Sequence, residues 1–528
     1  MSNLNHLLSR ISTAKNYAEI TEITRGIEKE SLRVTSNGTL SNRLHPTTLG
    51  SALTHPQITT DASEALLELI TQPTTSLNTT FASLKELHTF TYQHMHNEQL
   101  WVTSMPCTLG EDRDILAAQY GSSNTGKLKS IYRVGLGHRY GRALTIAGIH
   151  YNFSVSDEFW YFLKAYNNSK LSLKDFKTQG YFRLIRNFLR YFWLLLYLFG
   201  ASPCVCRSFV KHQKHALSVF PNTVNTLYRP YATSLRMSDI GFKSKAQDNL
   251  VVTYNCLDSY INTLCSAIKK PHKAYIDKGV KNAAGNYQQL NDSLLQIENE
   301  FYSVIRPKRT SQKGETGLSA LAERGIEYIE VRCMDINPDA PLGISPQQVH
   351  FLDTFLLYCL LTESPATDTL EYRHIQDNQQ RVANHGRKPD IILIDQGKER
   401  PMQEWANDLL DHCHGVATLL DRASQSKHHR QSVAKARAKV ADSTLTPSAK
   451  MLTEMSVKQC DFQQYAMQLS QERKAYVKKQ PLIKLNEYTV MAQRSIKQQQ
   501  EMEARNDVSF EQYLQHYYAQ YPRTKAAY

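Results

Sequence analysis

The chain has 528 residues, of which 41% are hydrophobic, 10% aromatic and 21% charged, and its formal net charge is +13. These proportions exclude an intrinsically disordered chain, and the length allows one large domain or several ordinary ones. Much of the excess charge lies in residues 422–450, where seven Lys or Arg accompany a single acid, Asp442. Such a run is typical of a solvated surface and also fits the steering of anionic substrates. No aromatic-studded basic groove accompanies it, so we expect no nucleic-acid partner.

The cysteines and the apolar stretches favour a cytoplasmic protein without membrane association. Nine cysteines are scattered without paired spacing, so no disulfide framework is predicted. The most apolar stretch, residues 191–200, has about half the length of a membrane-spanning helix and is expected to be a buried core helix. Residues 1–11 lack the apolar segment that follows a basic start in a signal peptide.

Hydrophobic periodicity predicts helices and strands in an irregular succession. A short amphipathic helix is expected over residues 1–20. Strand-like alternation is found over residues 26–34, 149–155 and 326–333. Long helical patterns are found over residues 80–97, 179–199, 346–362 and 487–505. Because the strands lack regular βαβ spacing, the pattern favours an α+β fold. We expect one α+β domain over residues 1–400 and a helical C-terminal appendage over residues 401–528, packed on that domain.

Two motifs suggest familiar sites but lack the context that those sites need. Residues 121–127 read GSSNTGK and match a phosphate-binding loop. However, Leu128 replaces the magnesium-binding hydroxyl residue, and residues 114–120 read as a helix where a buried strand is required. The His-Cys-His run at 412–414 has no partner pair at zinc-site spacing. We expect neither a phosphate-binding loop nor a zinc site.

Acidic and basic side chains recur on the polar faces of the three predicted strands. Alternate side chains of a strand share a face, so Glu28 and Glu30 project together. His150 occupies the polar face of the second strand, and Glu330 and Arg332 that of the third. The second and third strands also have a continuous apolar face. The three strands therefore describe a curved sheet with helices behind it and a polar bowl in front.

A fourth segment, residues 59–70, adds three more acids. The spacing of Asp61, Glu64 and Glu68 places them on one stripe of a predicted helix. A capping box would account for Asp61 with Glu64, and for Glu64 that explanation is sufficient. Glu68 is well inside the predicted helix, where capping cannot be its role.

Each of these residues also has an ordinary structural explanation. Glu28 and Glu30 fit an exposed edge strand, and His150 fits a hydrogen-bonded core histidine. A shared polar site accounts for all of them at once. Carboxylates with a single histidine suit Mg²⁺ or Mn²⁺ better than zinc, and such ions facing Arg332 are typical of phosphoryl transfer.

Eight ordered sequence blocks resemble the bacterial glutamate–cysteine ligase family along nearly the whole chain. Among them are RGIEKESLRV at 25–34, LGSALTHPQITTDASEALLELIT at 49–71, IAGIHYNF at 146–153 and RGIEYIEVRCMDINP at 324–338. The GSSNTGK run belongs to a further block at 119–141. The resemblance implies a glutamine-synthetase-like fold, in which an antiparallel sheet curves into a half-barrel backed by helices.

The resemblance also implies a role for each candidate residue. It implies two or three Mg²⁺ or Mn²⁺ ions. One would be held by Glu30, Asp61 and Glu68, and one nearer the ATP γ-phosphate by Glu28, His150 and Glu330. Catalysis would involve Glu330 and also Arg332, which would lie beside the transferring phosphoryl group. The acceptor pocket would be formed by Ala62, Tyr132, Arg236, Phe242 and Tyr302.

The activity implied is the ATP-dependent ligation of the γ-carboxylate of glutamate to the amine of cysteine, through γ-glutamyl phosphate. This is the first step of glutathione biosynthesis, its partners are small molecules, and we expect a monomer. Two positions depart from the family pattern: Ala62 stands where Phe is usual, and Phe242 where Tyr is usual. Both belong to the acceptor pocket. A γ-glutamyl ligase with another amine acceptor is therefore the alternative.

Overall fold

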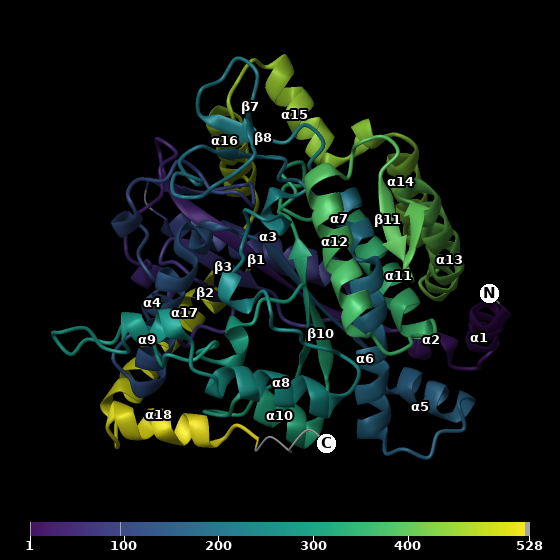
Figure 1. The fold of residues 1–528 in the computed structure, drawn as a ribbon, viewed down its shortest axis with the longest axis horizontal. Coiled ribbons are helices and arrows are strands. Elements are labelled where there is room, and N and C mark those ends of the chain that lie inside the picture. Colours follow the sequence, from purple (N-terminus) through teal and green to yellow (C-terminus); the bar gives the residue numbers. More distant parts are fainter. Residues whose placement is uncertain (1, 96, 523–528) are drawn as a thin grey trace.

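A seven-stranded open sheet runs through the middle of the molecule in the computed structural model, which describes residues 2–95 and 97–522 (Figure 1). The strand order is β2–β3–β1–β5–β10–β9, and β4 pairs with the end of β1. Every pairing in this sheet is antiparallel. The strands are β1 (Ile23–Thr35), β2 (Ile58–Thr60), β3 (Leu66–Ile70), β4 (Glu98–Leu100), β5 (Ile149–Val155), β9 (Ile305–Lys308) and β10 (Tyr328–Met334). The predicted α+β class with a mainly antiparallel sheet is confirmed.

The three predicted strands are all present, and their two faces differ as expected. Residues 149–155 coincide with β5, while β1 is longer than predicted and β10 begins two residues later. On β5 the side chains of Ile149, Tyr151 and Phe153 are fully buried. We call this apolar side of the sheet its back face, and the side that carries Glu28 and Glu30 its front face.

Helices cover the back face, as Figure 1 shows. They are α6 (Leu173–Tyr191), α7 (Trp193–Phe199) and α11 (Pro346–Leu361). Every residue of α7 is buried, which confirms the predicted core helix within residues 191–200. Ser345 starts α11 through a capping box with Gln348, and Pro346 fits its first turn because that position needs no amide donor.

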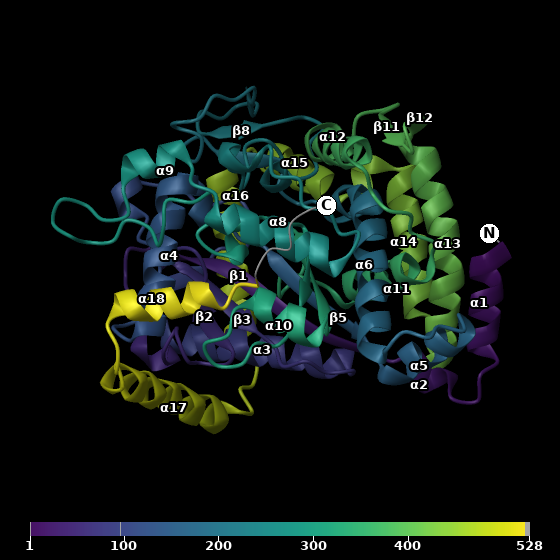
Figure 2. The same ribbon diagram turned by 60° about the horizontal axis from the view of Figure 1, so that its bottom comes forward.

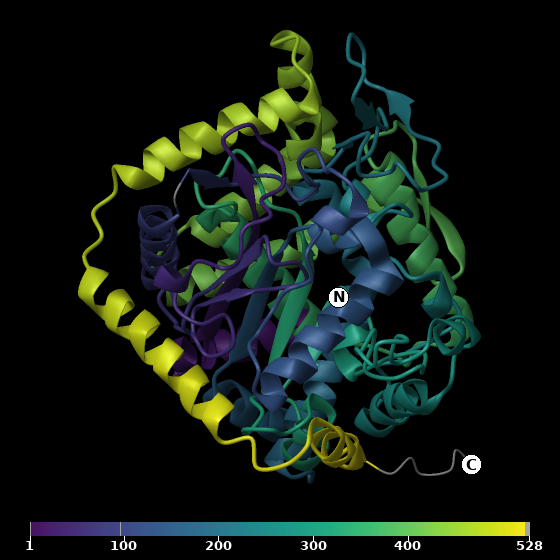
Figure 3. The same cartoon turned by 90° about the vertical axis from the view of Figure 1, so that its left-hand side faces the viewer.

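The chain beyond residue 400 is helical, as predicted, and follows a short hairpin. The hairpin consists of β11 (Ile392–Asp395) and β12 (Lys398–Pro401). The helices are α13 (Met402–Ala423), α14 (His428–Ala441), α15 (Pro447–Val457), α16 (Phe462–Lys478), α17 (Leu485–Ala504) and α18 (Phe510–Ala519). Two of these, α13 and α14, lie on the α11 side of the sheet (Figure 2). The last three follow an arc around the opposite side (Figure 3). One hydrophobic core includes residues from both sides of position 400, and the domain boundary there stays a prediction.

Two of the predicted helices are wrong and two are divided, one of them being residues 179–199, which α6 and α7 share. Residues 59–70 form the ends of β2 and all of β3, joined by a turn. From its sequence alone, the short apolar run is compatible with a helix or a strand. It forms a strand because β3 pairs with β1. Residues 114–120 are irregular apart from the end of a short 3₁₀ turn. Residues 1–20 contain two helices, α1 (Ser2–Ser12) and α2 (Tyr17–Ile20).

The remaining elements surround the sheet. They are α3 (Leu77–His94), α4 (Asn124–Tyr140), α5 (Asp157–Tyr166), α8 (Leu257–Lys269), α9 (Lys273–Lys278), α10 (Gly317–Arg324), α12 (Thr369–His385) and a small sheet of β6 (Cys204–Cys206), β7 (Ser218–Val219) and β8 (Thr226–Tyr228). All nine cysteines are free thiols. No helix in the described residues has both the length and the apolar character needed to cross a membrane.

Candidate active site

The pairing register of the sheet brings the predicted acids together on its front face. Glu28 of β1 lies opposite His150 of β5, and Glu30 lies opposite Glu68 of β3. On the other side of β5, strand β10 adds Glu330. Because alternate residues of each strand share a face, these five side chains form a row across four adjacent strands. Glu68 therefore reaches the site from a strand, and its predicted position on a helix is corrected.

His150 stands at the centre of this row. Its Nδ1 lies 3.0 Å from Glu28 Oε2 and 3.9 Å from Glu68 Oε1. Its Nε2 lies 3.4 Å from Glu30 Oε1. The ligand atoms of Glu28, Glu68 and His150 all lie within 4.8 Å of one another. Asn152 donates a hydrogen bond of 2.7 Å to Glu28, which fixes that carboxylate beside the imidazole.

At one end of the row the negative charge is not balanced. Burial, reinforced by the negative charges of Glu28, Asp61 and Glu30, raises the pKa of Glu68 well above its usual range. Burial also raises the pKa of Glu30, although His150 opposes that shift. Carboxylates crowded in this way hold protons unless a cation lies between them. This end of the row is therefore electrostatically suited to a positive ion.

At the other end, basic side chains supply the balance. Glu330 Oε2 lies 2.9 Å from Arg332 Nη1, and Glu330 Oε1 lies 3.2 Å from Lys308 Nζ. Burial alone would raise the pKa of Glu330, but Lys308 and Arg332 lower it well below its usual value. The buried Nε of Arg332 has no hydrogen-bond partner in the described part of the chain. Arg332 is thus held by Glu330 while one of its donors stays unused.

The predicted acceptor residues line one cavity next to this row. All five of them contribute to its wall: Ala62, Tyr132, Arg236, Phe242 and Tyr302. Glu30, Asp61, His150 and Arg332 line the same cavity, so the two groups of predicted site residues meet there. The Phe242 ring stacks on Tyr140 at a centroid distance of 4.3 Å and lies 5.3 Å from the Tyr302 ring. The cavity is therefore polar on the sheet side and aromatic on the other.

Two glycines make room for the groups that shape this cavity. A side chain at Gly241 would overlap the carbonyl oxygen of Arg236, so the turn that presents Phe242 requires glycine. A side chain at Gly148 would overlap the Arg236 guanidinium. Without one, the Arg236 guanidinium packs directly against Gly148 and donates a hydrogen bond of 2.9 Å to the carbonyl oxygen of Arg332.

Asp61 lies at the cavity but is not free. It follows β2 in the turn to β3, and its carboxylate pairs with Arg133 of α4 at 2.7 Å. Its neighbour Glu64 caps no helix and instead accepts hydrogen bonds from the backbone amides of His45 and Gln119. Sequence reasoning missed Arg133, although it stands next to Tyr132 in one of the family-like blocks. It also missed the other polar residues of the cavity wall, Asn299, Glu300 and Arg306.

The loop that mimics a phosphate-binding loop binds the chain's own C-terminal part. The amide of Ser122 donates to Glu503 at 2.8 Å, and that of Asn124 donates to Asn506 at 3.0 Å. Ser123 accepts from the amide of Gly126 as the cap of α4. A helix does follow the loop, but these amides already have partners.

Comparison with known proteins agrees with this arrangement. The sequence model of the glutamate–cysteine ligase family matches residues 8–382. The chain belongs to this family. It is 49% identical over 512 residues to the glutamate–cysteine ligase of Saccharophagus degradans, covering 96% of each chain. It is 46% identical over 525 residues to that of Alcanivorax borkumensis, covering 98% of this chain and all of the other.

A solved member of the family has the same fold. The crystal structure of the Francisella tularensis glutamate–cysteine ligase in complex with AMP superposes with a TM-score of 0.88. The match covers 94% of this chain and 98% of the other, at 36% identity. The predicted family and the enzyme class, a ligase, are confirmed. The roles of individual residues stay predictions.

Proposed function

We propose that the chain joins the γ-carboxylate of glutamate to the amine of cysteine with consumption of ATP, giving γ-glutamylcysteine, ADP and phosphate. This reaction is the first step of glutathione biosynthesis. The observation that carries the proposal is the single cavity where the predicted acceptor residues meet the acidic row and Arg332. The AMP bound to the Francisella tularensis relative supports the use of an adenine nucleotide.

The acidic row fits two or three Mg²⁺ or Mn²⁺ ions. Its donors are carboxylate oxygens with one imidazole, which suit hard cations. The raised pKa of Glu68 and the unpartnered buried Oδ1 of Asn152 both favour a cation here. Glu30, Asp61 and Glu68 would hold one ion, and Glu28, His150 and Glu330 another. When bound, such ions neutralise the acids and bind the phosphate oxygens of ATP.

The chain's own residues position the reactants and balance charge. Arg332 neutralises charge as the γ-phosphoryl group moves from ATP to the glutamate γ-carboxylate, and Glu330 fixes its guanidinium. The rings of Phe242, Tyr140 and Tyr302 exclude water from the acyl phosphate, which the amine then attacks, releasing phosphate. No cysteine lines the cavity among residues 2–95 and 97–522, so we propose that neither step uses a cysteine nucleophile.

The second candidate is a γ-glutamyl ligase with another amine acceptor. The observation that favours it is the pair of departures in the acceptor pocket. Ala62 is small where a ring is usual, and Phe242 offers no hydroxyl to an acceptor. In either case we propose a cytoplasmic monomer that acts on small molecules.

The deciding experiment measures ADP and phosphate release by the purified protein with ATP, glutamate and a panel of amine acceptors. We expect turnover with cysteine, weaker turnover with 2-aminobutyrate, no turnover in chelator, and recovery with excess Mg²⁺ or Mn²⁺. Preference for an unrelated amine would support the second candidate. Full turnover in chelator would exclude the metal assignment.

A further inference from the structure

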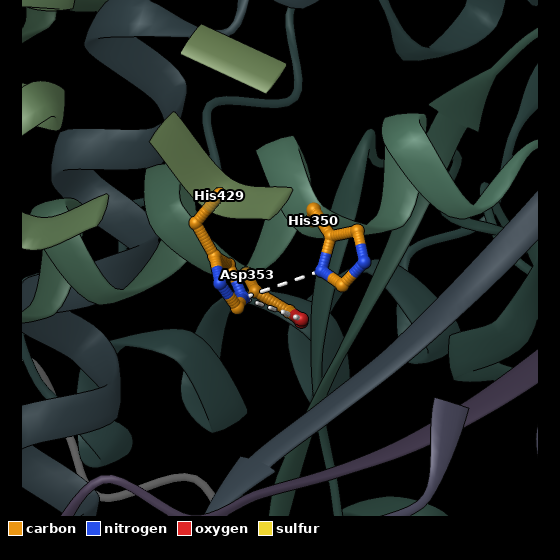
Figure 4. Close-up of side chains that lie close together, drawn as sticks. All are labelled: His350, Asp353 and His429. Atoms are coloured by element: carbon orange, nitrogen blue, oxygen red, sulfur yellow. Dashed lines mark hydrogen bonds and ion pairs between the residues drawn. The ribbon is translucent and has the colours of Figure 1, made fainter. Parts of the chain in front are cut away.

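A second group of metal-binding side chains lies behind the sheet, away from the reaction. His350 and Asp353 are one helical turn apart on α11, and His429 is in the first turn of α14. Figure 4 shows all three side chains pointing toward one another. Their ligand atoms lie within 4.8 Å of one another. The proposed reaction uses none of them.

The carboxylate of Asp421 orients the His429 ring. Asp421 Oδ1 lies 3.0 Å from His429 Nδ1 and also accepts the backbone amide of the same residue. Its other oxygen accepts from Arg430. An ionised carboxylate only accepts hydrogen bonds, so the Nδ1 of His429 carries the proton. Its Nε2 faces His350 Nδ1 and Asp353 Oδ2, and in the neutral form of the ring that nitrogen has a lone pair for an ion. The same carboxylate–histidine arrangement orients histidine ligands in metal proteins.

The spacing of the two imidazoles matches a tetrahedral ion. His350 Nδ1 and His429 Nε2 are 3.4 Å apart. Two nitrogens bound to one zinc ion at about 2.0–2.1 Å with a tetrahedral angle are about 3.4 Å apart.

Asp353 offers a third ligand that its own partners hold in place. Its Oδ2 lies 3.9 Å from His429 Nε2 and accepts from Arg25 Nε and Nη2 at 2.9 and 2.8 Å. Tyr151 donates to Oδ1. Each oxygen of an ionised carboxylate accepts about two hydrogen bonds, so the second lone pair of Oδ1 remains for an ion. The charge of Arg25 makes this site weaker than a purely structural zinc centre.

An ion can enter from solvent. Asp353 and His429 are buried, while His350 is partly exposed and stacks on the exposed His428 at a centroid distance of 5.1 Å. We infer that His350, Asp353 and His429 bind one ion of the borderline class represented by Zn²⁺, with water completing its coordination. Imidazole ligands favour Zn²⁺ over Mg²⁺, so this ion differs in kind from those of the front face. It would link α14 of the C-terminal part to α11.

The test uses chelator-treated full-length protein in excess Mg²⁺, which occupies oxygen-rich sites. Zn²⁺ is titrated by calorimetry, and Co²⁺ is used as a spectroscopic probe. We expect one Zn²⁺ per chain bound in competition with Co²⁺, a tetrahedral Co²⁺ spectrum without a thiolate band, and a higher melting temperature with Zn²⁺. His350→Gln and Asp421→Asn should each weaken binding at least about tenfold.

His414→Gln is the matched control, because His414 is exposed on α13 within the His-Cys-His run. It should leave Zn²⁺ binding unchanged. Two results would overturn the inference: no Zn²⁺ binding by the wild type, or equal affinity in the wild type and in both the His350 and the Asp421 variants. Either result would mean that these three residues do not bind the ion.

Discussion

The two faces of the sheet handle buried charge in opposite ways. On the back face, burial raises the pKa of Asp353, but Arg25 pairs with it and holds the pKa below its usual value. On the front face, burial and three nearby carboxylates raise the pKa of Glu68. A buried charge with a partner of opposite sign supports the fold, whereas like charges gathered together are costly until an ion joins them. Arg25 neutralises the buried charge of Asp353 on the back face, whereas the acids around Glu68 on the front face lack enough positive partners within the protein.

The largest effect on stability is expected from removing the buried ion pair between Asp353 and Arg25 on the back face. Asp353→Asn leaves Arg25 buried without its counter-charge and should lower the free energy of unfolding by about 3–5 kcal/mol. Urea denaturation measures this loss. Glu111→Gln breaks the exposed pair with Lys211 and serves as the control, with an expected change below about 1 kcal/mol. A similar small loss in both variants would contradict the comparison.

On the front, neutralising an acid should affect activity instead. Glu68→Gln and Glu330→Gln should each lower turnover by about a hundredfold, or about 2.7 kcal/mol of transition-state stabilisation, without unfolding the protein. Steady-state kinetics with ATP, glutamate and cysteine measure the effect, and circular dichroism checks the fold. The exposed Glu323→Gln should behave like the wild type. Near-normal rates in both front-face variants would place the site elsewhere.

Without metal, the excess negative charge of the front face should also affect how stability depends on pH. Since the pKa of Glu68 is raised in the folded state, folding is favoured while Glu68 is protonated and is disfavoured as the pH rises through that pKa. In chelator at pH 8, Glu68→Gln should therefore be more stable than the wild type, by about 1 kcal/mol. Parallel melting curves from pH 5 to 8 test this, and the difference should shrink at low pH. A variant less stable than the wild type at pH 8 would show that the row is already balanced.

The smallest effect is expected in the acceptor pocket, away from the charges. Phe242→Tyr with Ala62→Phe should lower the KM values for cysteine and 2-aminobutyrate by about two- to tenfold, because a hydroxyl contact and a packed ring are restored. The KM values for ATP and glutamate should stay nearly constant. A change in ATP or glutamate handling with unchanged acceptor KM would mean that another segment forms the acceptor pocket.

Features of the sequence that repeat locally were predictable. Alternation in β5 predicted both its bounds and its buried face, and β1 and β10 followed with small shifts. Glu68 was assigned to a helix because a run as short as residues 66–70 has a sequence that fits a strand as well as a helix. Its place opposite Glu30 depends on pairing between separate segments. The carboxylate row was therefore foreseen, but not the strand that completes it.

The countercharges of the site were not predictable in the same way. Arg133 comes from α4 to pair with Asp61, and Lys308 comes from β9 to pair with Glu330. Asp353 on α11 reaches Arg25 on β1 across more than 300 residues of sequence. These pairs depend on the packing of distant elements, which no local pattern in the sequence reports.

The central claim is that the front face is left unbalanced for divalent ions. Mn²⁺ binding to chelator-treated protein, followed by electron paramagnetic resonance in the presence of ATP, tests it most directly. We expect two or three Mn²⁺ per chain in the wild type, and at least about tenfold weaker binding at one of these sites in Glu68→Gln. Equal binding by the two proteins, or none by the wild type, would contradict it.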